Sequence, residues 1–567
     1  MEKNRIVIIG GVAAGPKAAA RARRRDPHAE ITIIERGDWL SYAGCGLPYY
    51  VQGVIEHDDE LRATPTGAVR DSDFFRDTKD VTVLTHTEVQ AIHRDQKLVD
   101  TVNHLTGERR RIPYDKLVLA TGGTPVTPTI EGAHLKGVFR LYHPTEAVRL
   151  REVVKGGQVR RAAILGGGLI GMESAEALAE HGVQVTLVEM MDHILPQLLD
   201  FEVAAFLAKH LTAKGVQIRT GERVVKMEGD NGQVRRLVSE TGVLETDLVL
   251  VAVGVRPNVE LARAAGLAIG PTGGIAVNDR LQTSDPDIYA GGDCVENLHR
   301  VTGEGCFIPL GSTANKHGRV IGDNVTGGDT RFPGVLGTTI FKAFDYNVGR
   351  VGLTERQARQ RGHQVFTALV PGPDRAHYYP TSRMLLVKLV VDAADSRVLG
   401  AQVVGPGTAD KRVDVVAAAM HFGARVDDLA DIDLCYAPPY SSPIDPVATA
   451  ANVVRNKRDG LAHSITPMEV KEKLDRGDDF LFLDVRTPGE YQMVRIEDPR
   501  VKLIPLGQLR RRLEELPRDK EIVTFCALSL RGYEAQRILN GAGFSRVRFM
   551  DGGVTAWPYS VSRKQPS

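Results

Sequence analysis

The sequence predicts an α/β protein built from several domains. Three segments carry this prediction, because in each an apolar strand runs into a short loop and then a helix. Two of these loops are rich in glycine and follow residues 6–9 and 162–165, and the third begins at Cys526 after residues 521–525. Strands that alternate with helices build parallel sheets. The length of 567 residues exceeds one hydrophobic core, so we expect roughly three or four domains.

The composition is that of an ordinary globular protein with a net charge of +1, so neither nucleic acid nor a membrane surface is predicted as a partner. Five cysteines in 567 residues do not make a disulfide framework, which favours a reducing compartment. The N-terminus runs directly into a strand without a signal peptide, and no apolar stretch approaches the ~18 residues of a membrane span. We therefore expect a cytoplasmic protein, and we identify no metal-binding motif.

The first glycine-rich loop is typical of a nucleotide-binding βαβ unit. Glycines let the backbone approach a pyrophosphate, and the N-terminus of the following helix favours its charge. Val12 replaces the second glycine of the usual fingerprint, but Glu35 ends the next strand, where a carboxylate can accept from ribose hydroxyls. A solvated charge at the strand end is the alternative for Glu35. The candidate binding residues here are Gly10, Gly11, Ala14, Gly15 and Glu35.

The second loop carries the complete fingerprint, with Gly166, Gly168 and Gly171 in register. The strand after its helix ends at Glu189. A negative charge there accepts hydrogen bonds from a free 2′-hydroxyl and repels a 2′-phosphate, so NADH is favoured over NADPH, although other residues can compensate.

Two further strand ends support a pair of bound dinucleotides. Residues 117–123 form a strand that closes on a tight turn at Thr121 and Gly122, and residues 288–293 form another that ends at Asp293. The Asp293 carboxylate stands where a flavin ribityl hydroxyl can be bound. Residues 247–258 fit the end of the second nucleotide-binding unit. The ordered set of segments is far more specific than any one of them.

Cys45 follows the first nucleotide-binding unit and is a lone thiol, since the nearest other cysteine is Cys294. Enzymes that reduce disulfides through an internal dithiol need two cysteines a few residues apart. A lone thiol beside a redox cofactor indicates that the second sulfur belongs to the substrate, or that the sulfur cycles between thiolate and sulfenate. A buried, inert cysteine is the alternative, and the flanking glycines and cofactor loops argue against it.

Residues 1 to about 450 resemble the flavoprotein pyridine nucleotide-disulfide oxidoreductases, and specifically the single-cysteine branch that contains coenzyme A disulfide reductases and persulfide reductases. The resemblance rests on residues 10–15, on Ser41 and Cys45 followed by residues 47–49, and on residues 436–440. It implies FAD at the first loop, NAD(P)H at the second, and a homodimer built by residues 335–450.

Lys17, Arg21 and Arg24 follow the first loop at a spacing that places them on one face of a helix. A pyrophosphate needs only the helix N-terminus, so a substrate with a phosphorylated end, such as coenzyme A, is one explanation for this basic stripe. A solvated basic face is the other, and charge alone leaves both open. The resemblance favours coenzyme A and implies that Ser41 lies near its thiol arm.

The resemblance also implies that tyrosines of the third domain act as acids near the cysteine of the other subunit. We favour Tyr378 and Tyr436 for this role, while the choice between Tyr378 and Tyr379 stays open. Ordinary interface packing is the alternative for these tyrosines.

The C-terminal strand–cysteine–helix segment places Cys526 at the base of a loop of backbone N–H groups. The helix dipole and Arg531 are expected to lower the pKa of the thiol and suit it to hold a persulfide. Residues 464–560 resemble a rhodanese domain in residues 483–486, 526–531 and 551–558. Many rhodaneses carry a Gly-His-Ile element where this chain reads residues 494–499. An inactive domain, or arsenate or phosphate chemistry in the loop, stays open.

These segments predict five ranges along the chain. We expect two Rossmann-like domains for FAD and NAD, an α+β dimerisation domain and a C-terminal α/β rhodanese domain. The ranges are 1–150 for the first part of the FAD domain, 151–275 for NAD(P)H, 276–334 for the second part of the FAD domain, 335–455 for dimerisation and 464–560 for the rhodanese.

We therefore expect an NADH-driven flavoprotein that reduces persulfide, polysulfide or coenzyme A disulfide bonds at Cys45. The rhodanese favours a persulfide, because a coenzyme A disulfide has no sulfane sulfur for Cys526 to carry. Three alternatives stay open: a plain coenzyme A disulfide reductase, an NADH oxidase or peroxidase, and a redox-sensing sulfur carrier. The basic stripe argues against the oxidase, since oxygen and peroxide need no phosphate site.

Overall fold

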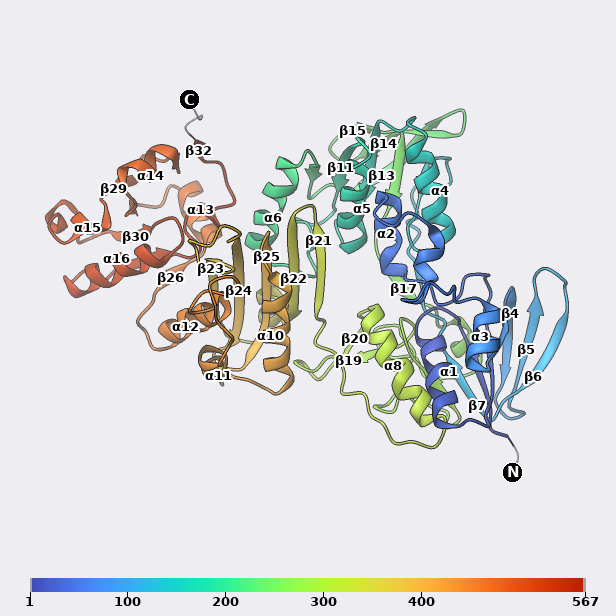
Figure 1. The fold of residues 1–567 in the computed structure, drawn as a ribbon. Coiled ribbons are helices and arrows are strands. Elements are labelled where there is room, and N and C mark those ends of the chain that lie inside the picture. The colour runs from blue at the N-terminus through green and yellow to red at the C-terminus, as the bar shows by residue number, and fades with distance from the viewer. Residues whose placement is uncertain (1–2, 564–567) are drawn as a thin grey trace. The chain divides into compact units, whose positions relative to one another are not determined.

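The computed structural model describes residues 3–563 (Figure 1). Contacts divide the chain into two units. Unit 1 comprises the residues up to 190 together with 221–335, and unit 2 comprises 191–220 together with the residues from 336 onward. The predicted α/β class is confirmed, since both glycine-rich loops and the C-terminal cysteine loop come directly after strands of parallel sheets. No helix between residues 3 and 563 has the length and apolar character that crossing a membrane requires.

The first parallel sheet of unit 1 carries the first nucleotide loop. Most residues of its strands are buried and apolar, as expected when helices or a second sheet cover both faces, whereas the edge strand over residues 82–84 is only partly buried. Helices α1 and α8 pack together over one face, as Figure 1 shows in blue and yellow-green, and a smaller antiparallel sheet lies toward the other. The parallel strands in spatial order are β18 (Ile288–Ala290), β7 (Lys116–Leu119), β1 (Arg5–Ile9), β2 (Glu30–Ile34) and β3 (Thr82–Leu84). The other elements are α1 (Ala14–Arg25), α3 (Ser72–Lys79), α7 (Glu260–Ala264), α8 (Gly311–Asn324), β4 (Thr87–His93), β5 (Leu98–Asn103) and β6 (Arg109–Pro113).

The second parallel sheet of unit 1 carries the second nucleotide loop. Helix α5 follows that loop, and the short helix α2 packs against α5 and α4. An antiparallel hairpin sheet shares a core with this parallel sheet. The parallel strands in order are β11 (Gln184–Val188), β10 (Arg161–Leu165), β16 (Leu248–Val251) and β9 (Val138–Phe139). The other elements are α2 (Leu47–Gln52), α4 (Pro144–Lys155), α5 (Leu169–Ala179), β13 (Val224–Asp230), β14 (Gln233–Ser239), β15 (Val243–Glu245) and the paired strands β8 (Gly123–Pro125) with β17 (Val255–Pro257) and β19 (Asn297–Leu298) with β20 (Gly305–Cys306).

Unit 2 contains an antiparallel sheet with helices packed on it. A buried lysine, Lys388, joins strand β24 to helix α6, since its Nζ lies 2.5 Å from Glu202 Oε1, 3.0 Å from Asp200 Oδ2 and 2.7 Å from Glu355 Oε2. The strands in order are β21 (Thr339–Ala343), β22 (Tyr346–Gly352), β25 (Val398–Gly405), β24 (Met384–Asp392) and β23 (Val365–Pro373). The other elements are α6 (Phe201–Ala213), β12 (Gln217–Arg219), α9 (Glu355–Gln360), α10 (Ala409–His421), α11 (Val426–Asp431) and α12 (Pro446–Arg458).

The C-terminal part of unit 2 is a five-stranded parallel sheet that positions the Cys526 loop between strand β30 and helix α16. The strands in order are β26 (Ser464–Ile465), β31 (Val547–Met550), β30 (Glu521–Phe525), β27 (Phe480–Asp484) and β29 (Val501–Leu503). The other elements are α13 (Pro467–Asp475), α14 (Pro488–Met493), α15 (Leu506–Leu509), α16 (Leu530–Gly541) and the paired strands β28 (Val494–Arg495) and β32 (Ser562–Arg563).

Candidate functional site

The first nucleotide loop, residues 10–15, joins β1 to α1 through glycines that no other residue can replace. Gly10 has φ +112°, and a Cβ there would lie 2.1 Å from the Ala120 carbonyl oxygen. A Cβ at Gly15 would lie 1.9 Å from the Gly10 oxygen. The Gly11 N–H donates to Glu35 Oε2 at 2.7 Å. The carboxylate at the end of β2 therefore fixes the loop directly.

The second nucleotide loop, residues 166–171, repeats this arrangement between β10 and α5. Gly166 has φ +101°, and a Cβ at Gly171 would lie 2.1 Å from the Gly166 oxygen. The Gly167 N–H donates to Glu189 Oε2, again at 2.7 Å. Space is open beside Gly168, where a Cβ would meet no atom within 4 Å, so the backbone is accessible to a pyrophosphate.

The end of strand β7 is hydrogen-bonded to the segment that follows β17. Thr121 Oγ1 donates to the Asn258 carbonyl at 2.8 Å, and the Asn258 amide donates back to the Thr121 carbonyl at 2.8 Å. Gly122 follows with φ +66°. These bonds join the end of β7 to the segment after β17, although the two lie far apart in the sequence.

The Asp293 carboxylate provides a direct test of whether the first loop fits a flavin. Burial raises the pKa of Asp293 above its ordinary value. No hydrogen bond to this carboxylate is found among residues 3–563. A partly buried carboxylate without a donor fits the ribityl hydroxyls of a flavin, because they supply the hydrogen bonds that it lacks. The residues present therefore fit FAD.

Cys45 lies in a short 3₁₀ turn, Gly44–Gly46, and is exposed. A Cβ at Gly311 would lie 3.7 Å from the Cys45 sulfur, so the thiol faces the N-terminus of α8. Partial burial of the sulfur, and then the charges of Glu173 and Asp293, raise the pKa of the Cys45 thiol. The positive end of the α8 dipole acts in the opposite direction and favours the thiolate.

Ser41 connects Cys45 to the first loop. It has φ +48°, and its N–H donates to the Gly11 carbonyl at 2.8 Å. Its own carbonyl accepts from Arg70 Nη1 at 3.2 Å. Ser41 is therefore held in a left-handed conformation directly beside the first nucleotide loop, and it precedes the Cys45 turn in the chain.

Glu173 and Tyr49 are candidate residues to which the sequence analysis gave no role. Glu173 lies on α5 after the second loop, and the Tyr49 hydroxyl donates to its Oε1 at 3.5 Å. Burial raises the pKa of Glu173 to about 7, and burial followed by the Glu173 charge raises that of Tyr49 to about 12. The sequence held a signal for both residues. Glu173 comes directly after the fingerprint glycines, and Tyr49 lies four residues after Cys45.

The basic stripe on α1 lies along the seam between α1 and α8. A Cβ at Gly318 would lie 2.6 Å from Lys17 Cβ, and one at Gly322 would lie 2.6 Å from Arg21 Cβ, so the helices are in close contact. Arg21 Nε donates to Asp323 Oδ1 at 2.6 Å, which neutralises that member of the stripe. Lys17 and Arg24 are exposed, and Lys316 and Arg319 add exposed cations on α8. These two cations were not predicted from the sequence, because they lie in a distant segment.

Unit 2 brings together the two tyrosines that the sequence analysis favoured. Tyr378 is 66% exposed and Tyr436 is 49% exposed. A hydrogen bond with the Tyr378 hydroxyl raises the pKa of Tyr436 above its ordinary value. Tyr379 is less exposed than Tyr378. A pair of exposed, hydrogen-bonded hydroxyls is able to relay a proton to a group that docks on this surface.

The loop from Cys526 to Arg531, hereafter the rhodanese loop, is held by backbone hydrogen bonds. The Val554 N–H donates to the Cys526 carbonyl at 2.9 Å, and the Gly552 N–H donates to Ser529 Oγ at 2.5 Å. Ser529 has φ +92°, an uncommon conformation for a residue other than glycine. Cys526 is 1% exposed at the base of the loop. Such a fixed conformation at a nucleophile is typical of a functional site.

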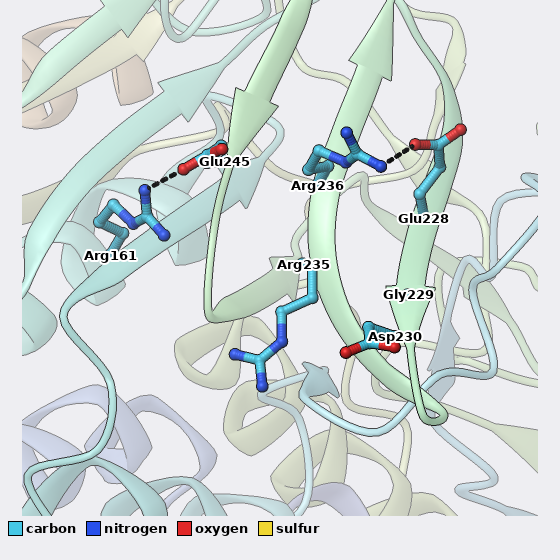
Figure 2. A pocket seen from close by; sticks show the side chains of 7 residues that line it. All are labelled: Arg161, Glu228, Gly229, Asp230, Arg235, Arg236 and Glu245. Carbon is cyan, nitrogen blue, oxygen red and sulfur yellow. Dashed lines mark hydrogen bonds and ion pairs between the residues drawn. The ribbon is translucent and has the colours of Figure 1, made fainter.

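Unit 1 has a shallow pocket that is lined by none of these residues (Figure 2). Figure 2 shows Arg161 paired with Glu245 at 2.6 Å and Arg236 paired with Glu228 at 3.2 Å. Three arginines and three carboxylates line it, so its charge is balanced. No predicted site residue is among its lining residues, which are Arg161, Glu228, Gly229, Asp230, Arg235, Arg236 and Glu245.

Three family models match consecutive parts of this chain. The model described as pyridine nucleotide-disulphide oxidoreductase matches residues 4–313, and its dimerisation domain matches residues 338–447. The rhodanese-like domain matches residues 466–558. Together they cover both nucleotide loops, Cys45, the two tyrosines and the rhodanese loop.

Two solved structures match nearly the whole chain, and a further relative matches four fifths of it. A solved structure of an NAD-dependent persulfide reductase from A. fulgidus is 46% identical, covers 98% of this chain and 100% of its own, and superposes with a TM-score of 0.93. The reduced Bacillus anthracis CoADR-RHD structure is 36% identical, with 98% of each chain covered and a TM-score of 0.91. An NAD(P)H coenzyme A polysulfide/persulfide reductase of Pyrococcus horikoshii is 38% identical over 80% of this chain and 99% of its own.

Proposed function

The chain belongs to the pyridine nucleotide-disulphide oxidoreductase family, and from that membership we propose that it reduces persulfide and polysulfide sulfur, carried on coenzyme A, at the expense of NADH. FAD and NAD(P)H are the cofactors of the family. The observation that carries the choice of substrate is the fused rhodanese loop with its nucleophile Cys526. A sulfur-carrying cysteine has a task in persulfide reduction and none in the reduction of a coenzyme A disulfide.

The first loop, with Gly10, Gly11, Gly15 and Asp293, would hold FAD, and the second loop would hold NADH. Together these cofactors would supply the electrons that return Cys45 to its thiolate after each turnover. The Cys45 thiolate attacks the sulfur–sulfur bond of the persulfide, sulfide leaves, and coenzyme A stays in a mixed disulfide with Cys45. The α8 N-terminus favours the attacking thiolate. Lys17 and Arg24, with Lys316 on the facing helix, bind the phosphates of coenzyme A, while Ser41 positions its thiol arm.

We propose a homodimer as the working form, because residues 338–447 match a dimerisation domain. In this arrangement Tyr436 of the partner subunit and Tyr378 of the partner subunit protonate the leaving sulfur. Their mutual hydrogen bond supports this role. One hydroxyl gives its proton to the leaving sulfur, and the other hydroxyl then donates a proton to the first. The use of NADH favours the cytoplasm as the compartment. We also propose the domain ranges predicted from the sequence: 1–150 and 276–334 for FAD, 151–275 for NAD(P)H, 335–455 for dimerisation and 464–560 for the rhodanese.

The decisive experiment compares coenzyme A persulfide with coenzyme A disulfide under anaerobic conditions. The measurements are kcat/KM for NADH oxidation and the sulfide released. We expect a preference of at least about tenfold for the persulfide, or ~1.4 kcal/mol of transition-state stabilisation, with one sulfide for each NADH. Cys45→Ser should lose both reactions while retaining FAD.

A preference for the disulfide would instead identify a thiol-maintenance enzyme. Rapid oxidation of NADH by oxygen or peroxide, without a sulfur substrate, would favour the oxidase alternative. Retained flavin without turnover of any small sulfur compound would favour a sulfur carrier. Each of these results contradicts the proposed substrate.

A further inference from the structure

The positive charge of the rhodanese loop is already neutralised within the protein. Arg531 is the loop's one charged residue, and its Nη1 and Nη2 donate to the two Glu490 carboxylate oxygens at 2.8 and 2.5 Å. Glu490 is itself held at the start of α14, where its carboxylate accepts from the Thr487 N–H at 3.0 Å. Arg531 also forms a hydrogen bond with the Cys526 side chain. The bidentate pair with Glu490 balances the charge of the guanidinium, so no unmatched cation is left for an incoming anion.

Two further cations, one in the rhodanese domain and one on α12, are matched in the same way. Arg486 Nη2 lies 2.6 Å from Asp484 Oδ2, and both side chains are almost fully buried. Lys457 Nζ lies 2.6 Å from Asp551 Oδ2, directly before the glycines that hold the rhodanese loop. The Cys526 sulfur therefore lies beside a guanidinium, that of Arg531, whose charge Glu490 already balances.

The outer part of the loop is apolar. Leu530 is 66% exposed and Leu528 is 37% exposed, while Cys526 is 1% exposed. The hydrogen bond from Gly552 to Ser529 fixes the backbone between these two leucines. Two leucines held at the surface of a nucleophile loop offer contact area to an apolar group of a donor, and offer none to charged oxygens.

We infer that the rhodanese loop takes its sulfur from a donor with an apolar tail and selects against the thiosulfate dianion. This inference rests on the proposed sulfur-accepting role of Cys526 and specifies the class of its donor. The sulfite part of thiosulfate would place two charges beside Leu528 and Leu530 without a free cation to receive them. An apolar tail removes the same leucine surface from water.

The transfer has the same chemistry for both classes of donor. The Cys526 thiolate forms a bond to the outer sulfur, the old sulfur–sulfur or sulfur–sulfonyl bond breaks, and its electron pair leaves with the departing group. Thiosulfate releases sulfite, and an aryl thiosulfonate releases a sulfinate. Cys526 becomes a persulfide in each case, with no external oxidant or reductant. Cyanide then accepts the outer sulfur as thiocyanate and restores the thiolate.

The test uses the full chain without NADH and measures thiocyanate formed from thiosulfate and from benzenethiosulfonate. These donors differ by one charge and one phenyl ring. We expect kcat/KM to favour benzenethiosulfonate by about tenfold or more, with Cys526→Ser losing both activities. Leu530→Lys should raise thiosulfate use and lower that ratio about tenfold. Glu490→Gln should also raise the use of thiosulfate, because glutamine keeps the cap of α14 and leaves the charge of Arg531 unbalanced.

Leu105→Lys is the matched control, since Leu105 is 73% exposed and lies outside the rhodanese domain; it should leave the donor ratio unchanged. Equal or better use of thiosulfate by the wild-type chain, still dependent on Cys526, would overturn the donor preference and leave the proposed function standing. An unchanged ratio in both Leu530→Lys and Glu490→Gln would also overturn it. Absence of thiocyanate from both donors, with Cys526 still open to alkylation, would contradict the sulfur-accepting role itself.

Discussion

Glu173 and Tyr49 form a partly buried pair in which the carboxylate changes its protonation near neutral pH. Burial raises the pKa of Glu173 from 4.5 to about 7, so the folded protein holds a proton there that the unfolded chain releases above pH ~4.5. Stability contributed by this site therefore falls as pH rises from about 4.5 to 7, and the cost of the ionised carboxylate is complete above pH ~7.

Glu173→Gln should accordingly stabilise the protein more at pH 8 than at pH 5. The shift corresponds to at most about 3 kcal/mol, and a gain of about 1–2 kcal/mol at pH 8 is a realistic expectation. Chemical unfolding at the two pH values measures it. Glutamine keeps an acceptor for the Tyr49 hydroxyl, so a gain of the same size at both pH values would contradict the titration of Glu173.

Glu189 should decide between NADH and NADPH. Its Oε2 accepts from the Gly167 N–H, so Glu189→Gln removes the negative charge and keeps an acceptor for the loop. We expect kcat/KM for NADPH to rise about tenfold relative to NADH, equivalent to ~1.4 kcal/mol, in steady-state assays with both coenzymes. Glu180→Gln removes an exposed charge at the C-terminal end of α5, the helix that follows this loop, and should leave the ratio unchanged. An unaltered ratio in Glu189→Gln would assign coenzyme choice to other residues.

At the scale of elements, the pairing of α1 with α8 depends on glycines of α8. A Cβ at Gly318 would lie 2.5 Å from the Ala14 carbonyl oxygen. Gly318→Ala should therefore push the helices apart at a cost of about 1–3 kcal/mol. Because α1 begins at the first nucleotide loop, bound flavin should also be lost. Thermal unfolding and flavin absorbance measure the two effects.

Gly541→Ala provides the comparison, since Gly541 ends α16 and a Cβ there would meet no atom within 4 Å. It should be neutral or slightly stabilising, because alanine has the higher helix propensity. If Gly318→Ala proved equally harmless, the close approach of α1 and α8 would not limit stability.

The sequence was sufficient for elements that short-range patterns define. Both carboxylates at strand ends, Glu35 and Glu189, accept from their loops, and the α/β class is confirmed. Contacts between distant segments could not be predicted from the sequence. Arg21 was assigned to a stripe for phosphate, yet Asp323, 302 residues away, neutralises it. The bond between Glu490 and Arg531 likewise spans 41 residues. No local spacing encodes such contacts, because only tertiary packing brings the partners together.

At the scale of the whole molecule, a buried ion pair joins α12 to the rhodanese domain within unit 2. The Lys457 and Asp551 side chains are 9% and 4% exposed, and Lys457 Nζ also donates to the Thr367 carbonyl at 2.6 Å. Lys457→Met should leave Asp551 buried and unpaired, at a cost of about 3–5 kcal/mol in the free energy of unfolding. Lys520→Met breaks an exposed pair with Asp479 and should change nothing measurable. Similar denaturation curves for the two variants would contradict a fixed rhodanese domain.

Fusion of the two activities in one chain should matter for long sulfur chains more than for small persulfides. Fusion raises the effective concentration of one site at the other. Cys526→Ser should therefore reduce turnover of polysulfide severalfold and leave that of coenzyme A persulfide unchanged, with sulfide release as the measurement. An unchanged polysulfide rate would show that sulfur reaches Cys45 without the rhodanese domain.

The unsatisfied carboxylate of Asp293 makes cofactor uptake a proton-linked equilibrium. Burial raises its pKa while it lacks a donor, and ribityl hydroxyls that donate to it would lower that pKa again. Binding would then release a proton, so by Wyman linkage the affinity for flavin increases with pH through the acid range. Mild acid is therefore the natural route to a flavin-free protein, and a return to neutral pH the natural route to its reconstitution.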